Sequence, residues 1–384
     1  MIYLDNAATS FPKPEAVYSA VDHYQRSNGA PVGRGAYNAT LDVTASVHRC
    51  RKQIADLLGA QSPEQIVFTF NCTDSLNLVL HGLLQPGDHV VTSQIEHNSV
   101  LRPLSTLQHS RHIQVTQVPA DSNGKVDPFQ FRQALQANTK LVALMHASNV
   151  TGTIQPIHEV GELAHRAGAL FLVDGAQTAG QLPIQLRDAP IDLFAFAGHK
   201  GLLGPLGTGG LYLRPGVEER VASLRQGGTG THSEDDVQPS SLPDKYESGN
   251  HNAPGLVGLE AGVSWLLGRG VESVHRQEQE LILQLLEGLA EIPNLRQLGP
   301  CSAADRVGVV SITIPDYEPQ AVAAILDQSF GIAVRAGLHC APGAHRALGS
   351  LESGGTVRIS VGPFTTAAEI DAVVAALSQI AATA

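Results

Sequence analysis

One lysine lies in a sequence context that favours covalent chemistry over a role as a surface charge. Lys200 sits in the segment AFAGHKGLLGPLGTGG, between apolar, strand-like residues and a glycine-rich stretch. A buried lysine loses its proton readily, and the neutral amine forms Schiff bases with carbonyl compounds. The segment therefore suits a site for pyridoxal phosphate (PLP); the alternative is a lysine on an exposed turn.

An acid and an amide follow the apolar run LFLV upstream of this lysine. Asp174 ends the run, where a buried carboxylate would need a cationic partner. A protonated pyridine nitrogen is such a partner, and the carboxylate that keeps it protonated makes the ring of PLP an electron sink. Gln177 lies near the same strand end and is a candidate to hydrogen-bond the ring hydroxyl. The alternative role for Asp174 is a helix N-cap.

Two further segments place polar residues where a strand is expected to end. In FTFNCTDSLNLVL, Cys72, Thr73 and Asp74 fall in the first turn of an expected helix, whose backbone N–H groups and dipole would bind a phosphate. The same residue types also cap helices without binding anything. His97 lies just past another strand, in the crevice where open α/β sheets bind ligands. It is a candidate to stack on the PLP ring and exchange protons, with a structural role as the alternative.

Alternating strand-like and helix-like segments predict the scaffold that positions these residues. Expected helices at 75–84 and 157–168 separate short apolar runs. Such runs are typical of a parallel sheet covered on both faces. The strands are expected at 65–70, 89–94, 113–119, 141–148 and 170–177.

After about residue 255 the pattern changes to long helices, short strands and a final helix that Thr365 or Thr366 would cap, which predicts a separate α+β domain. The segment 226–252 is rich in Gly, Ser, Pro and Asp and is expected to be a long loop.

Composition excludes several classes of partner. The 384 residues are 43% hydrophobic and 16% charged, as in globular proteins, and the formal net charge of −11 disfavours nucleic-acid binding. No apolar run is long enough for a membrane span, and the segment MIYLDNAAT is not a signal peptide, so a cytoplasmic location is expected. Without a CxxC pair, the cysteines are expected to be free thiols: Cys50, Cys72, Cys301 and Cys340.

The motifs YLDNAAT, EHNS, SNVTG, VDGAQ, GHK, RAGLHCA and VRIS, in this order and spacing, resemble the cysteine desulfurase branch of the fold-type I PLP enzymes. This class V aminotransferase-like group also contains selenocysteine lyases, and the short cysteine loop is closest to the group II desulfurases. The resemblance implies a homodimer with an α/β fold. A large PLP-binding domain (15–255) would hold a mostly parallel seven-stranded sheet between helices. Residues 1–14 and 256–384 would form the smaller α+β domain.

The resemblance also implies a role for each residue of the cofactor site. Lys200 would bind PLP as a Schiff base, and Lys200, Cys340 and His97 would be catalytic. Asn250 would contact the phosphate bound by the neighbouring subunit. The other residues implied to bind PLP are Cys72, Thr73, His97, Asn149, Asp174, Gln177, His199 and Lys200.

For the substrate, the resemblance implies that Cys340 is the nucleophile and that Arg358 pairs with the substrate carboxylate. Its planar guanidinium suits two parallel hydrogen bonds to a carboxylate. Asn149 and Arg335 are further substrate-binding candidates. Arg335, His339 and His345 lie close enough to Cys340 in sequence to favour a thiolate.

The expected reaction converts L-cysteine to L-alanine and leaves a persulfide on Cys340, which a sulfur-acceptor protein or a reducing thiol must discharge. No metal is implied. The alternatives are a selenocysteine lyase, another C–S lyase or aminotransferase of the same fold, and a catalytically silent scaffold. Three positions depart from the family pattern: Ala197 replaces a Ser or Thr, Asn250 a threonine, and Gly33 a histidine of the substrate loop.

Overall fold

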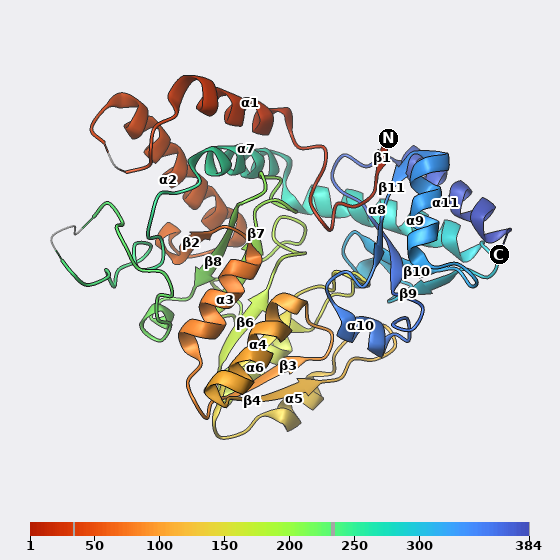
Figure 1. Cartoon of the computed structure of the whole chain (residues 1–384), viewed down its shortest axis with the longest axis horizontal. Coiled ribbons are helices and arrows are strands. Elements are labelled where there is room, and N and C mark those ends of the chain that lie inside the picture. Colours follow the sequence, from red (N-terminus) through yellow and green to blue (C-terminus); the bar gives the residue numbers. More distant parts are fainter. Residues whose placement is uncertain (34, 232–234, 384) are drawn as a thin grey trace.

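A seven-stranded sheet organises the larger part of the chain in the computed structural model, which describes residues 1–33, 35–231 and 235–383 (Figure 1). The strand order is β2–β8–β7–β6–β5–β3–β4. Strands β4, β3, β5, β6 and β7 pair in parallel, and β8 is antiparallel to both of its neighbours. The expected mostly parallel seven-stranded sheet is confirmed. Its strands are β2 (Ile66–Thr69), β3 (His89–Ser93), β4 (Gln114–Val118), β5 (Thr139–Met145), β6 (Leu170–Asp174), β7 (Leu193–Ala197) and β8 (Gly209–Leu213).

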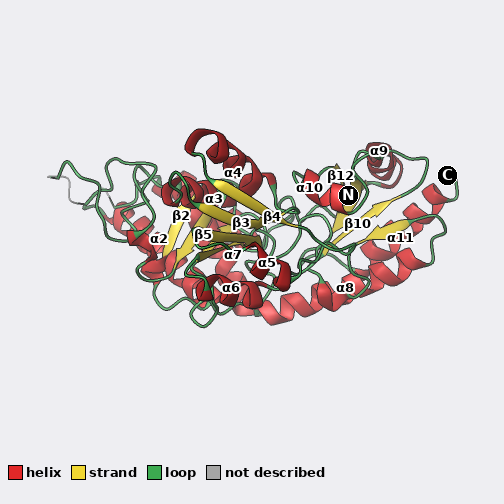
Figure 2. Ribbon diagram, turned by 90° about the horizontal axis from the view of Figure 1, so that it is seen from below, coloured by secondary structure: helices red, strands yellow, loops and turns green. Residues whose placement is uncertain are grey.

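Helices cover both faces of this sheet (Figure 2). One face carries α3 (Cys72–Leu83) and α4 (Asn98–Arg111), and the other carries α2 (Asn38–Leu58), α5 (Pro128–Ala134), α6 (Ile157–Arg166) and α7 (Ala253–Arg269). Helix α1 (Glu15–His23) packs on α7.

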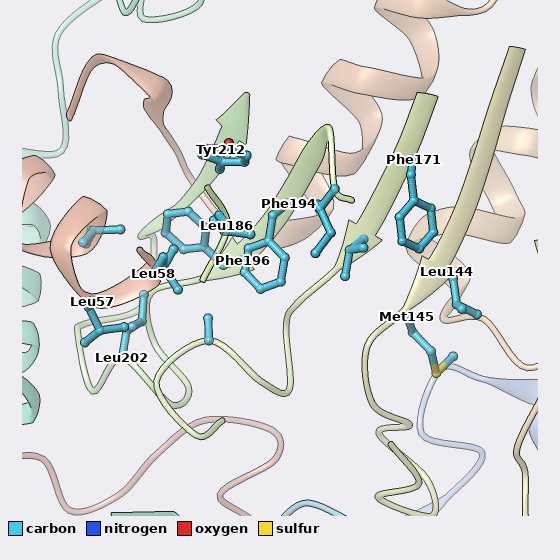
Figure 3. Packing of buried hydrophobic residues seen from close by; sticks show 14 of the residues in the cluster. Leu57, Leu58, Leu144, Met145, Phe171, Leu186, Phe194, Phe196, Leu202 and Tyr212 are labelled. Carbon is cyan, nitrogen blue, oxygen red and sulfur yellow. The ribbon is translucent and has the colours of Figure 1, made fainter. Parts of the chain in front are cut away.

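Alternate side chains of the central strands point to opposite faces of the sheet, so they contribute to two separate hydrophobic cores. On β6, Phe171 and Val173 join the core beneath α2, α6 and α7, whereas Leu170 and Leu172 join the core beneath α3 and α4. Successive side chains of a strand point to opposite faces, so a strand buried on both sides is apolar throughout. Figure 3 shows the first core, where Phe171 and two phenylalanines of β7, Phe194 and Phe196, project from neighbouring strands.

The C-terminal part forms a smaller layer of helices on a four-stranded antiparallel sheet, in the order β12–β13–β10–β9. The short strand β1 (Ile2–Tyr3) pairs in parallel with β11 (Ile332–Ala333), so the N-terminal segment lies on this part of the molecule (Figure 1). The remaining elements are α8 (Val271–Ala290), β9 (Arg296–Leu298), β10 (Val309–Thr313), α9 (Pro319–Phe330), β12 (Arg335–Gly337), α10 (Pro342–Ala347), β13 (Thr356–Ser360) and α11 (Ala367–Ala381). Thr366 caps α11 in a reciprocal capping box with Glu369.

The expected loop at 226–252 has no helix or strand in its described residues, 226–231 and 235–252. Its end is anchored by the buried Glu247, which accepts hydrogen bonds from Arg51 (2.7 Å) and from the backbone N–H of Phe68 (2.6 Å). No helix in the described part of the chain is long and apolar enough to span a membrane.

Candidate active site

A cavity of about 90 Å³ lies where parallel strands β5, β6 and β7 end, the edge at which open α/β sheets bind ligands. We call it the lysine cavity. Every cofactor-binding residue expected from the sequence lies in it except Asn250. It is lined by Asn71, Cys72, Thr73, His97, Ser99, Met145, Ala147, Asn149, Asp174, Ala176, Gln177, Ala197, His199 and Lys200.

Asp174 is held at the end of β6 by one of its two carboxylate oxygens. Its Oδ1 accepts hydrogen bonds from the Ala176 N–H (2.9 Å) and from the thiol of Cys72 (3.3 Å). Turns follow the strand, so the helix N-cap alternative is wrong. Burial, then the charge of Asp174, raises the pKa of Cys72 well above its usual value, which keeps this thiol protonated as a donor. In the described part of the chain no hydrogen bond reaches Oδ2 of Asp174.

Lys200 follows β7, and two effects act on the pKa of its side chain in opposite directions. Burial lowers the pKa of its ammonium, while the carboxylate of Asp174 acts in the opposite direction. Among the described residues no hydrogen bond engages Nζ of Lys200. The net effect is a lowered pKa, which favours release of the ammonium proton.

Three side chains of the lysine cavity carry buried polar atoms without a partner in the described structure: Oδ1 of Asn149, Oε1 of Gln177 and Nδ1 of His199. Asn149 and Gln177 are fixed from their other ends, by donating to the carbonyl oxygens of His339 (2.6 Å) and Ala7 (3.0 Å). Leaving a buried polar atom unpaired is unfavourable by about 1–3 kcal/mol. A ring hydroxyl would donate to one of the two amide oxygens and a phosphate oxygen would accept from a protonated Nδ1 of His199, so the residues present fit PLP.

His97 caps α4 with its own side chain. Its Nδ1 accepts from the Ser99 N–H (3.1 Å), so in the neutral ring the proton is on Nε2. Burial lowers the pKa of His97, with the charge of Asp174 opposing, which favours the neutral ring at pH 7. Ser99, which sequence reasoning did not single out, lies two residues on within the EHNS motif.

The first turn of α3 borders the same cavity. Asn71 caps the helix by accepting from the Asp74 N–H (2.9 Å), and the carboxylate of Asp74 accepts from the Phe70 N–H (3.1 Å), so Asp74 has the local capping role that the alternative expected. Asp74 also pairs with Arg225 (3.2 Å). Within the described residues the hydroxyl of Thr73 makes no hydrogen bond, and the N–H groups of Cys72 and Thr73, at the start of the helix, have no intrahelical acceptor. This end of α3 has the donors that an anion requires.

Cys340 lies in a second hollow, of about 410 Å³, rather than in the lysine cavity itself. We call this hollow the α3–α4 groove. It shares Thr73, His97 and Ser99 with the lysine cavity, so the two adjoin. It is lined by Thr73, Asn77, His81, His97, Asn98, Ser99, Arg102, Pro103, Thr106 and Cys340.

The backbone holds the exposed Cys340 in an unusual conformation. His339 and Cys340 have φ values of 47° and 58°, in the left-handed region that disfavours side chains with a Cβ. The Asn98 N–H donates to the Cys340 carbonyl (2.8 Å), which fixes the loop to the start of α4. The guanidinium of Arg335 lies 3.8 Å from Sγ of Cys340.

The two histidines near Cys340 do not supply positive charge. Burial lowers the pKa of His339 to about 2 and that of His345 to about 4, so both are neutral at pH 7. His339 bonds to Thr356 and His345 to Ser350. The expectation that these histidines favour a thiolate is therefore wrong, because their rings are buried on the small sheet and under α10.

Arg358, on β13, is buried and joins three parts of the chain. It donates to Asp5 Oδ1 (2.6 Å) and to the carbonyl of Asn149 (3.1 Å), and its Nε has no partner among the described residues. Burial lowers the pKa of Arg358, with Asp5 opposing. Its neighbour in register on β12 is Arg335. Sequence reasoning missed Asp5, although it lies in the YLDNAAT motif.

Two of the three departures from the family pattern lie away from the lysine cavity. Asn250 is exposed in a separate hollow beside Phe70 and Arg225, and Gly33 does not line the cavity. Ala197 does line it and adds no hydroxyl.

The fold and the lysine–aspartate pair at the strand ends define a fold-type I enzyme of the kind that uses PLP. The family model for aminotransferase class-V matches residues 2–373, and the chain belongs to this family.

Relatives within the family have a consistent description. The chain is 38% identical to a probable cysteine desulfurase of Methanothermobacter thermautotrophicus (99% of this chain, 94% of the relative). A probable cysteine desulfurase of Vibrio cholerae is 34% identical (99% and 93%). Among solved structures, the apo cysteine desulfurase of Thermococcus onnurineus superposes with a TM-score of 0.92 at 34% identity (100% and 95%).

Proposed function

We propose that this protein is a PLP-dependent cysteine desulfurase that converts L-cysteine to L-alanine and forms a persulfide on Cys340. One observation carries the proposal: the groove that exposes the Cys340 thiol adjoins the lysine cavity through shared residues. An aminotransferase would have no use for an exposed thiol at this place. The names of the relatives support the same activity.

Four residues of the lysine cavity have a proposed task toward the cofactor. PLP, when bound, supplies a covalent attachment point for an amino group and an electron sink. Lys200 would attach PLP and move the proton of the substrate α carbon, since burial favours its neutral amine. Oδ2 of Asp174, which has no hydrogen bond in the described chain, would hold the ring nitrogen. Thr73, His199 and the first turn of α3 would bind the phosphate.

The substrate would be bound from the small-domain side. Nε of Arg358 is buried and unpartnered in the described chain, so a substrate carboxylate would complete the hydrogen bonding of this guanidinium. Arg335 lies between this site and Cys340 in the small sheet and would stabilise the thiolate. Asn149, whose carbonyl Arg358 already holds, would position the bound amino acid.

The sulfur step would be carried out by Cys340. Its thiolate attacks the sulfur of bound cysteine, an S–S bond forms and the C–S bond of the substrate breaks. The carbon skeleton keeps the electron pair, takes up a proton and leaves as alanine. One cysteine and one thiol thus give one alanine and one persulfide.

Alanine release from cysteine, with and without a reductant, tests the proposal. Wild type is expected to release alanine, and Cys340→Ala and Lys200→Ala are expected to lose at least about 100-fold in rate, since each removes a reacting group. Cys301→Ala, which removes another exposed thiol, is the control and should retain full activity. Retention of activity in Cys340→Ala would overturn the persulfide route.

We further propose a cytoplasmic homodimer, with Asn250 reaching the phosphate bound by the partner subunit. The exposed position of Asn250, outside the lysine cavity of its own chain, supports this arrangement. Phe11, Tyr18 and Leu206 expose apolar surface around a hollow of about 730 Å³, which a second copy could cover. Analytical ultracentrifugation should give twice the chain mass of 40.5 kDa; a monomer at micromolar concentration would contradict the dimer.

A further inference from the structure

The α3–α4 groove reaches the solvent beside the Cys340 thiol and has the size of a small-molecule site. Helices α3 and α4 lie side by side on one face of the sheet (Figures 1 and 2), and the groove of about 410 Å³ lies between them. Cys340 is fixed to this surface because its carbonyl accepts from the Asn98 N–H. A molecule in the groove would therefore meet the thiol in a defined position.

Charge distinguishes this groove from the rest of the molecule. The chain has a formal net charge of −11, yet no Asp or Glu is among the residues that line the groove. Arg102 lines it, is exposed, and makes no hydrogen bond or ion pair with any described residue. The nearby Asp74 is already paired with Arg225, and Asp174 lies in the lysine cavity. The groove thus favours an anion.

Neither histidine of the groove adds or removes charge at pH 7. Burial lowers the pKa values of His81 and His97, so both rings are neutral. The fixed charges facing a molecule in the groove are the guanidinium of Arg102 and, at the thiol, that of Arg335.

We infer that the α3–α4 groove binds a small anionic thiol, which takes the sulfur from Cys340 with Arg102 pairing its carboxylate or sulfonate. The inference rests on the proposed desulfurase function. The thiolate attacks the outer sulfur of the Cys340 persulfide, a new S–S bond forms, and the bond between that sulfur and Cys340 breaks. Cys340 leaves as a thiolate beside Arg335, and the released thiol carries the persulfide.

The test separates sulfur loading from sulfur discharge. Holoenzyme is incubated with cysteine without reductant, freed of cysteine, and checked for the Cys340 persulfide by intact-protein mass. Single-turnover discharge is then timed with mercaptopropionate (anionic), mercaptoethanol (neutral) and cysteamine (cationic). Because each thiol is compared with itself across variants, its intrinsic reactivity cancels. Failure of wild type to load would refute the proposed function; normal loading leaves the discharge rates to decide this inference.

Arg102→Glu should slow discharge by mercaptopropionate about 5- to 10-fold, speed discharge by cysteamine, and change mercaptoethanol less than about twofold. Raising the salt concentration should reduce these differences in discharge rate between Arg102→Glu and wild type. Arg132→Glu, which reverses an exposed arginine on α5 that makes no ion pair with any described residue, is the matched control and should leave all three rates unchanged. Equal effects of Arg102→Glu on all three thiols, or none on any, would overturn the inference, and a protein acceptor would then be the partner to seek.

Discussion

At the scale of single residues, the side chain of Arg335 is in contact with the thiol of Cys340. Arg335 is 3.8 Å from Sγ, and the two neighbouring histidines are neutral. Replacing Arg335 by Gln keeps much of the side chain and removes the charge. We expect alkylation of Cys340 by iodoacetamide at neutral pH to slow by about 3- to 10-fold, because less thiolate is stabilised.

The other exposed thiol, Cys301, is an internal reference in the same experiment. Its alkylation rate, followed by peptide mass spectrometry, should be the same in wild type and Arg335→Gln. A parallel slowing at both cysteines would mean that the substitution perturbs the fold and that Arg335 has no specific effect on Cys340.

A second residue-scale prediction concerns Glu96, a fully buried acid beside the catalytic candidate His97. Glu96 accepts from the hydroxyl of Ser93 (2.5 Å) and the N–H of Met145 (3.0 Å), and burial raises its pKa to about 8. The charge of Asp174 adds to this rise. The unfolded carboxyl releases its proton near pH 4.3, so between about pH 4 and about pH 8 the folded state binds more protons.

Stability should therefore fall as the pH rises through this window, and Glu96→Gln should remove part of the fall. We expect the thermal midpoint of the apoprotein to decrease by a few degrees more in wild type than in the variant between about pH 5 and about pH 8. Parallel curves for the two proteins would show that Glu96 does not titrate in the folded state.

At the scale of elements, α10 is seated against the end of β3 by a glycine. A Cβ at position 343 would overlap the carbonyl oxygen of Gln94, so Gly343→Ala must push α10, and with it the Cys340 loop, away from α4. We expect a lower thermal midpoint and at least a tenfold loss of persulfide formation, since displacements of about 1 Å are enough to impair positioned groups. Gly268→Ala on α7, where nothing lies within 4 Å, should be neutral or slightly stabilising.

The elements that the sequence predicted well are those with strong local signals. The apolar runs around β5 and β6 and the capped helix α11 needed only residues close in sequence. The short strands β11 and β12 and the helix α10 had no such pattern. The burial of His339 was equally hidden, because it depends on Thr356 and the rest of the small sheet rather than on its neighbours in sequence.

Contacts that are distant along the chain explain what sequence reasoning missed in the site. The Asp5–Arg358 pair joins residues 353 positions apart, and the Cys72–Asp174 contact joins residues 102 apart. Residue types indicated which groups could act. Which of these groups line the lysine cavity and which line the α3–α4 groove is determined by the fold and has no signal in the local sequence. The proposed roles of these residues, and the domain boundaries, stay predictions.

At the scale of the whole molecule, Arg358 connects the N-terminal segment, the small four-stranded sheet and the segment that follows β5 of the seven-stranded sheet. Asp5→Asn would leave this buried guanidinium without its anionic partner. We expect destabilisation by about 2–4 kcal/mol, seen as a lower thermal midpoint of the apoprotein. Asp22→Asn breaks the exposed pair with Arg26 and should change stability by less than about 1 kcal/mol. If Asp5→Asn and Asp22→Asn changed the stability equally, Arg358 would not have this connecting role.

The left-handed backbone conformation at Cys340 lowers stability, but the side chain there carries the thiol that the proposed reaction needs. Glycine adopts φ near 58° without the penalty of about 1–2 kcal/mol that a Cβ brings, but glycine has no thiol. Cys340→Gly should therefore give a protein that withstands heat better and transfers no sulfur. Selection of this chain for thermal tolerance alone would tend to discard Cys340, so the cysteine would persist there only under selection for the proposed sulfur chemistry.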